Sequence, residues 1–185
     1  MSDLWVFGYG SLMWRPGFDY VESQPALLRG AHRSLCVYSV VHRGTVQCPG
    51  LVLGLDAGGS CRGIALRVEA SAADATREYL RAREQVTQVY REVYRPIALQ
   101  DSSGRKVDAL CFLVDRKHQQ YAGRLSIAEQ AERVRNGHGQ SGDNIDYVAN
   151  TLRHLADMGL AEPSLEQVMS KVGDCAVVGE SGAEQ

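Results

Sequence analysis

Near the start of the chain stand the residues Val6-Phe7-Gly8-Tyr9-Gly10-Ser11-Leu12-Met13-Trp14, the stretch that decides the fold. The apolar residues 4–7 predict a β-strand, and the two glycines predict a sharp turn at its end because glycine accepts positive φ and has no Cβ. Successive N–H groups in such a turn can converge on an anion, typically a phosphate or a carboxylate. The loop from Tyr9 through Gly10 and Ser11 to Leu12 is therefore a candidate binding element, with a plain hairpin turn as the alternative.

Length and composition limit what the protein can be. Its 185 residues suffice for one domain with a full core, so we predict a single domain over residues 1–175 and a loose tail over 176–185. The net charge of −2, without a run of Lys or Arg, argues against nucleic acid as a partner. No apolar stretch approaches the roughly 20 residues of a membrane span.

The same features predict a cytoplasmic protein. The start Met1-Ser2-Asp3 lacks the basic region of a signal peptide. The five cysteines are unclustered and are expected to be reduced thiols. The histidines show no metal-ligand spacing, so we expect neither a metal nor a cofactor. The oligomeric state is not predicted.

The order of predicted elements indicates an α+β protein. Strands are expected over residues 4–7, 35–41, 51–55, 63–68, 89–97 and 107–114, in an antiparallel sheet closed as a small barrel. A helix is expected from Ser71, with a buried stripe of Ala75, Tyr79, Ala82 and Val86. The remaining helices are concentrated in the C-terminal third, from Tyr121 onward. A glycine-rich loop over 138–144 is expected to be either a lid or a flexible connection.

Two charged side chains are candidates for chemistry. Glu84 follows Leu80 by one helical turn, so it borders the buried face near the helix C-terminus. The helix dipole is expected to raise the pKa of a carboxyl group there, which would make it a better base near neutral pH. The alternative is a solvated surface glutamate beside Arg81 and Arg83. Arg43 could bind a carboxylate with both arms of its guanidinium, or could be an ordinary loop arginine.

Taken together, the segments resemble the ChaC family of γ-glutamylcyclotransferases. The resemblance covers about residues 4–155 and is carried by segments in family-like order: the loop of residues 6–14, Arg43-Gly44-Thr45, Pro49-Gly50, Gly63, Arg83-Glu84, Tyr90, and Ser141-Gly142-x-Asn144-x-x-Tyr147. One departure is that Gln88-Val89 precede Tyr90, where many members have glycine.

The resemblance implies a small antiparallel or mixed β-barrel with flanking helices, and an enzyme that cleaves glutathione to 5-oxoproline and Cys-Gly. In this reaction the α-amine of the γ-glutamyl group attacks its own γ-carbonyl, so no catalytic Ser, Cys or metal is needed. Glu84 would be the general acid and base. The backbone N–H groups of the loop Tyr9-Gly10-Ser11-Leu12 would hold the α-carboxylate or the oxyanion, and Tyr147, Tyr90 and Arg43 would orient the substrate.

Two alternatives remain open from the sequence. The same chemistry could act on other γ-glutamyl amines or dipeptides. The fold could also serve a non-catalytic metabolite-binding regulator, which would have no need of a base at Glu84.

Overall fold

The computed structural model describes residues 2–84, 88–102 and 104–180. They group into two compact units, one of Met1–Ser34 and Gly54–Gln119 and one of Leu35–Leu53 and Gln120–Gln185. Two long strands run from one unit into the other along the chain. The single domain expected over residues 1–175 stays a prediction.

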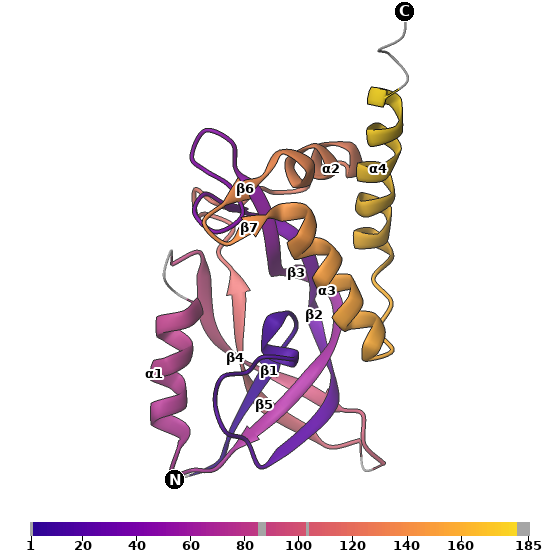
Figure 1. Ribbon diagram of the computed structural model, residues 1–185. Helices are drawn as coiled ribbons and strands as arrows, with labels where there is room; N and C mark the ends of the chain where they lie inside the picture. Colours follow the sequence, from indigo (N-terminus) through magenta and orange to yellow (C-terminus); the bar gives the residue numbers. More distant parts are fainter. Residues whose placement is uncertain (1, 85–87, 103, 181–185) are drawn as a thin grey trace, which may run out of the picture. The chain divides into compact units, whose positions relative to one another are not determined.

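The first unit is built on a barrel (Figure 1). Its strands are β1 (Leu4–Gly8), β2 (Glu22–Ser39), β3 (Gly50–Val68), β4 (Tyr90–Leu99) and β5 (Lys106–Val114). They close in the order β1-β3-β2-β4-β5, and β1 pairs in parallel with β5 while its pairing with β3 is antiparallel. The predicted small barrel in an α+β chain is therefore confirmed, and its sheet is mixed.

Two strands are longer than the sequence predicts, because glycine lets a strand bend without ending. Gly58 and Gly59 have φ of 96° and 70°, so β3 continues through the turn that was expected to separate residues 51–55 from 63–68. In β2, Gly30 has φ of 84°, and the buried positions shift from Ala26 and Leu28 to Ala31. Because the alternation of buried and exposed residues breaks at Gly30, the sequence pattern does not predict the first half of this strand.

Helix α1 (Ala73–Glu84) packs on the barrel through a different face from the predicted one. Its buried residues are Ala73, Thr76 and Leu80, whereas the side chain of Tyr79 is exposed. Leu80 joins the core cluster formed with Leu12 of the N-terminal loop and other barrel residues. The stripe predicted at Ala75, Tyr79 and Ala82 is thus wrong, and Val86 lies outside the described residues. The spacing of the buried residues, continued by one helical turn beyond Leu80, leads to Glu84.

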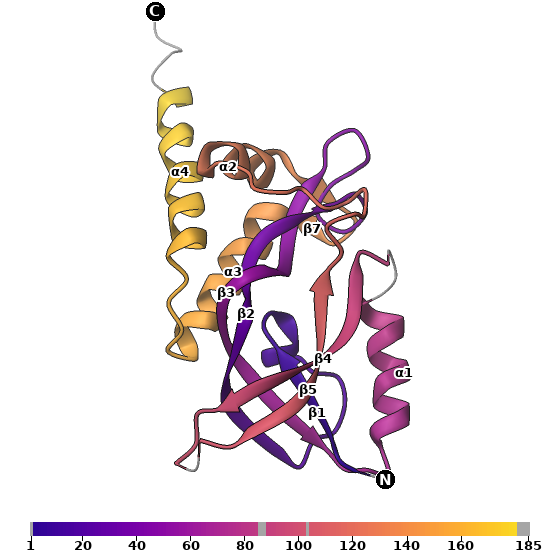
Figure 2. The same ribbon diagram turned by 180° about the vertical axis from the view of Figure 1, so that it is seen from behind.

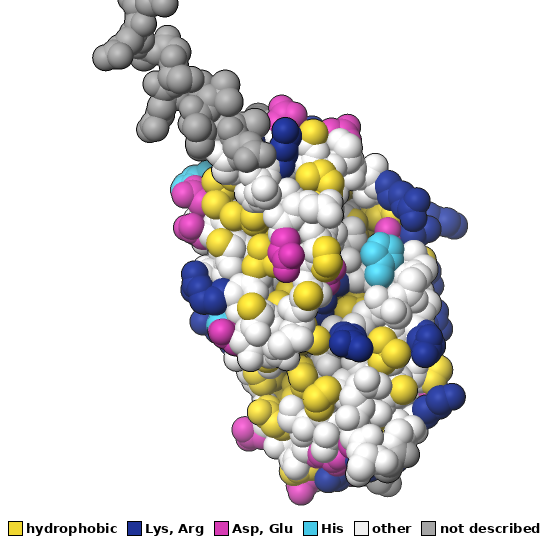
Figure 3. Space-filling view, turned by 90° about the vertical axis from the view of Figure 1, so that its right-hand side faces the viewer, with side chains coloured by type: hydrophobic (Ala, Val, Ile, Leu, Met, Phe, Trp, Pro, Cys, Tyr) yellow, Lys and Arg dark blue, Asp and Glu magenta, His cyan; other side chains and the backbone are white. Residues whose placement is uncertain are grey.

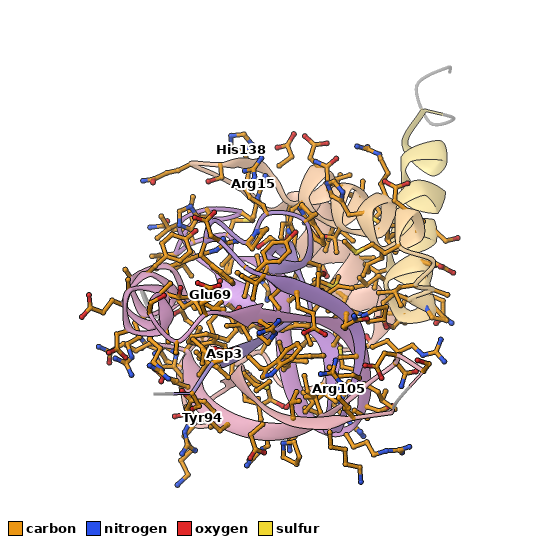
Figure 4. The ribbon with its side chains drawn as sticks, turned by 90° about the horizontal axis from the view of Figure 1, so that it is seen from below. Asp3, Arg15, Glu69, Tyr94, Arg105 and His138 are labelled. Atoms are coloured by element: carbon orange, nitrogen blue, oxygen red, sulfur yellow. The ribbon has the colours of Figure 1, made fainter. Side chains whose placement is uncertain are left out.

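A network of ion pairs connects several segments of the barrel. Arg67 on β3 binds Asp3 at 2.7 Å and Glu22 at 2.8 Å, and Arg105 binds Glu22 at 2.7 Å and Asp101 at 3.1 Å. Figure 4 labels Asp3 and Arg105, two members of this ion-pair network. Exposed pairs are worth little one at a time, so the pairs add local order more than stability.

The second unit is mainly helical. Its elements are α2 (Ile127–Asn136), β6 (His138–Gly139), β7 (Gly142–Asp143), α3 (Asn144–Asp157) and α4 (Pro163–Glu180), and α2, α3 and α4 pack on one another (Figure 2). Ser126 and Glu129 form a reciprocal capping box at the start of α2. Helix α4 continues to Glu180, so it includes residues 176–180 of the predicted tail.

The face drawn in Figure 3 carries acidic and basic side chains scattered among hydrophobic and other ones. Among the described residues, no helix is both long and apolar enough to cross a membrane.

Candidate active site

The glycine loop leaves the barrel at the end of β1. Gly8 pairs with Ile64 of β3, and a Cβ built on the neighbouring Gly63 would overlap the carbonyl oxygen of Gly8. The approach of the two strands therefore requires glycine at position 63. Beyond Gly8 the chain forms a short 3₁₀ helix, η1 (Ser11–Met13), closed by a hydrogen bond of 2.9 Å from the Met13 N–H to the Gly10 carbonyl.

The side chains of this loop divide between core and surface. Tyr9 and Leu12 are buried, and Leu12 lies in the core cluster with Leu80 of α1. Ser11 is exposed, and its Oγ accepts a hydrogen bond of 2.9 Å from Arg83 Nη2. The buried residues thus anchor a turn whose exposed part faces a charged side chain.

Glu84 is the last residue of α1, and its carboxyl group is largely buried, with 17% of the side chain exposed. Burial raises the pKa of this carboxyl group, and the positive charge of Arg83 partly opposes the rise. The direction matches the prediction from sequence, but desolvation is the leading cause where the sequence pointed to the helix dipole. A carboxylate with a raised pKa is a stronger base than an exposed glutamate, which suits a group that accepts and returns a proton.

Arg83 connects Glu84 to the loop. Its Nε lies 3.2 Å from a carboxyl oxygen of Glu84, and its Nη2 donates to Ser11. Its Nη1 donates to the carbonyls of Arg15 and Pro16, at 2.8 and 2.9 Å, in the segment after η1. The planar guanidinium thereby fixes the candidate base relative to the candidate binding loop, within one unit.

Tyr90, the first residue of β4, is half-buried and packs against the same core cluster that contains Leu12 and Leu80. The first unit therefore brings the predicted loop and Tyr90 to one core cluster, and Arg83 connects Glu84 to the loop.

The other two predicted residues lie in the second unit, where they contact each other. Arg43 Nη1 donates to the carbonyls of Ser141, at 2.6 Å, and Asp143, at 3.2 Å. Its guanidinium lies over the ring of Tyr147, 5.5 Å from the centroid. The Tyr147 hydroxyl accepts a hydrogen bond of 3.1 Å from the Leu53 N–H. Arg43 thus holds the turn before α3, and Tyr147 connects α3 to β3.

Sequence reasoning assigned no role to Asn144, although it belongs to the Ser141-Gly142-x-Asn144 motif. Asn144 is fully buried; its Oδ1 accepts from the Leu51 N–H at 2.6 Å and its Nδ2 donates to the Leu51 carbonyl at 2.8 Å. A Cβ on Gly50 would overlap the carbonyl of Arg43, so this glycine is needed for close approach. These contacts fix the start of α3 on β3.

The glycine-rich segment before α3 is a tight two-stranded turn of β6 and β7. His138, labelled in Figure 4, pairs with Asp143, and Ser141 Oγ lies 3.0 Å from His42 Nδ1. No three His, Cys, Asp or Glu side chains in residues 2–84, 88–102 and 104–180 are grouped to hold a metal.

A second residue without a sequence signal is Arg33 on β2. Its side chain is buried, and its Nε donates to the carbonyl of Tyr9. It is separated from the loop by more than twenty residues of chain, so only the barrel pairing brings the two together.

The mixed barrel and its flanking helices have the γ-glutamyl cyclotransferase type of fold. The crystal structure of the yeast γ-glutamyl cyclotransferase specific to glutathione superposes with a TM-score of 0.81 over 94% of this chain and 99% of the yeast chain, at 23% identity. The ChaC-like protein family model matches residues 4–175, and the chain belongs to this family.

Two relatives carry a named activity. The glutathione-specific γ-glutamylcyclotransferase of Escherichia coli K12 is 31% identical over 169 residues, which are 91% of this chain and 72% of that protein. The human glutathione-specific γ-glutamylcyclotransferase 1 is 32% identical over 166 residues, which are 88% of this chain and 73% of that protein.

Proposed function

We propose that the protein is a lyase of glutathione catabolism that converts glutathione to 5-oxoproline and Cys-Gly. The observation that carries the proposal is the buried Glu84 carboxyl group, whose pKa is raised and which Arg83 connects to the Ser11 loop. The names of the E. coli and human relatives support the same substrate.

In the proposed reaction, the substrate α-ammonium first gives a proton to the Glu84 carboxylate. The freed amine attacks the γ-carbonyl carbon, which forms the new ring C–N bond and a tetrahedral oxyanion. The bond to the cysteine nitrogen then breaks, and protonated Glu84 gives its proton to that nitrogen. The ring nitrogen still carries a second proton, which Glu84 takes up and passes to the released cysteine amine, so that 5-oxoproline leaves as a neutral lactam and Cys-Gly as an ammonium. Glu84 returns to its starting state and no water is consumed. Because the attack is intramolecular, holding the γ-glutamyl chain in a folded shape lowers much of the barrier.

The loop supplies the fixed donors in this proposal. The backbone N–H groups around Tyr9, Gly10, Ser11 and Leu12 hold the α-carboxylate or the oxyanion, and donors fixed in advance stabilise such charge most. Tyr90 orients the substrate in the same unit, and the role expected for Arg43 and Tyr147 of the second unit stays a prediction.

We place this activity in the cytoplasm, on a small-molecule substrate. Cys36, Cys48, Cys61 and Cys111 are free thiols, as expected in a reducing compartment that holds glutathione.

The test is release of 5-oxoproline from glutathione and, in parallel, from γ-glutamyl-alanine. We expect turnover of glutathione with the larger kcat/KM. Turnover of γ-glutamyl-alanine alone would transfer the activity to other γ-glutamyl compounds. Binding of 5-oxoproline without turnover of either compound would favour the non-catalytic regulator and contradict the proposal.

A further inference from the structure

Arg33 is a buried arginine beneath the glycine loop, with only 6% of the residue exposed. Its Nε donates to the carbonyl oxygen of Tyr9 at 2.6 Å, and its Nη2 donates to the carbonyl oxygen of Arg62 at 2.8 Å. The guanidinium thus joins strand β2, strand β3 and the loop. Burying an arginine is costly unless its donors are satisfied, so this position is a demanding one for a charged side chain.

The bond to the Tyr9 carbonyl controls which way the Gly10 N–H of the loop faces. A peptide group is planar and trans, so the Gly10 N–H points opposite to the Tyr9 carbonyl. Fixing that carbonyl from beneath the loop therefore directs the Gly10 N–H away from Arg33. The second bond anchors the same guanidinium next to Gly63, where β3 passes close to Gly8. The loop peptide is held from a rigid strand and has little freedom to rotate.

We propose that Arg33 is a positioning residue for the substrate loop: by binding the Tyr9 carbonyl, it orients the loop N–H groups toward the anionic part of the γ-glutamyl substrate. Its positive charge also favours an anion at the loop, since charges interact strongly in a buried setting. The inference rests on the proposed function and adds a residue that does not touch the substrate.

The experiment compares Arg33→Met, Arg33→Lys and the control Arg29→Met. Arg29 lies on the same strand, β2, but is exposed. For each variant, kcat and KM for glutathione, the affinity for 5-oxoproline by calorimetry and the melting temperature are measured. Lysine keeps the charge and a donor but lacks the planar fork that serves two carbonyls, so it tests geometry apart from charge.

For Arg33→Met we expect kcat/KM to fall by about 30-fold, because a misplacement near 1 Å can lower a rate by about 100-fold. For Arg33→Lys, kcat/KM should fall by about fivefold, and the melting temperature should stay near that of the wild type. A rise in KM with weaker 5-oxoproline binding assigns the loop to the carboxylate, and a fall in kcat alone assigns it to the oxyanion. Arg29→Met should keep wild-type kinetics.

Wild-type kcat, KM and 5-oxoproline affinity in a folded Arg33 variant would overturn the inference. If Arg33→Met fails to fold, the Arg33→Lys kinetics decide. A wild-type protein that turns over no γ-glutamyl compound would contradict the proposed function instead, so the two failures are distinct.

Discussion

Arg83→Met removes the side chain that connects the candidate base to the loop, including its ion pair with Glu84, while residue 84 itself stays glutamate. The substitution keeps an apolar stem of similar length and removes the hydrogen bonds to Ser11 and to the carbonyls of Arg15 and Pro16. A hydrogen bond to a charged group is worth about 1.5–3 kcal/mol, but these share one guanidinium that is 21% exposed. We therefore expect a total loss near 2 kcal/mol, which lowers the melting temperature by about 4–8 °C in a chain of this size.

The effect on activity has a defined sign. Arg83 lowers the pKa of Glu84 against the larger effect of burial, so its removal raises that pKa further. The base must be ionised to accept a proton, and the acid limb of kcat/KM reports its pKa in the free enzyme. The acid limb should therefore move to higher pH, while kcat/KM on the plateau falls by about 10- to 100-fold because the loop loses its anchor.

The assay is 5-oxoproline release from glutathione across a pH series, with thermal unfolding in parallel. Arg81→Met is the matched control, since Arg81 lies on the same helix and donates two hydrogen bonds to Glu92. It should lose at most about 1 kcal/mol and keep the wild-type pH profile. An unshifted or lowered acid limb in Arg83→Met, with plateau activity within threefold of wild type, would refute the reasoning.

Three further substitutions test the site and its support. Gly63→Ala places a Cβ against the Gly8 carbonyl, so we expect a loss of about 1–3 kcal/mol by denaturant unfolding and weaker 5-oxoproline binding; wild-type values would contradict the close approach. Asn144→Ala leaves the buried N–H and carbonyl of Leu51 without their partner, and unfolding should show a loss of about 2–5 kcal/mol; a loss below about 1 kcal/mol would contradict that role. Because burial raises the pKa of Glu84, its ionisation disfavours folding, and Glu84→Gln should gain stability relative to wild type as pH rises from about 4.5 to 7. A stability advantage of Glu84→Gln that shrinks as the pH rises over this range, measured in calorimetric scans, would contradict the direction of the Glu84 pKa shift.

The sequence predicts the elements that depend on local pattern. The glycine loop and the strand before it follow from a short motif, and the capping box of Ser126 and Glu129 fixes the start of α2. Strands that bend at positive-φ glycines were harder to predict. A turn was expected at Gly58 and Gly59 and no strand was expected around Gly30, whereas all three glycines lie within continuous strands. The buried face of α1 was predicted on the wrong residues, since Thr76 is buried and Tyr79 is exposed.

The candidate site also contains residues that the sequence predicts and residues that it does not. Glu84 and the loop were predicted from their motifs, but the connection between them was not, because Arg83 reaches Ser11 across a separation of 72 residues. Arg33 has no motif of its own, and its role follows only from the pairing of β2 and β3 in the barrel. Long-range contacts of this kind are set by topology, which a local pattern does not contain.

The central claim is that Glu84 moves the proton in glutathione cleavage, and Glu84→Gln tests it most directly. Glutamine is nearly isosteric and its Oε1 can still accept from Arg83, but it cannot take up a proton at neutral pH. We predict a fall in kcat of about 10²- to 10⁴-fold for 5-oxoproline release, with calorimetric affinity for 5-oxoproline within about threefold of wild type. A Glu84→Gln variant that releases 5-oxoproline at the wild-type rate would contradict the account.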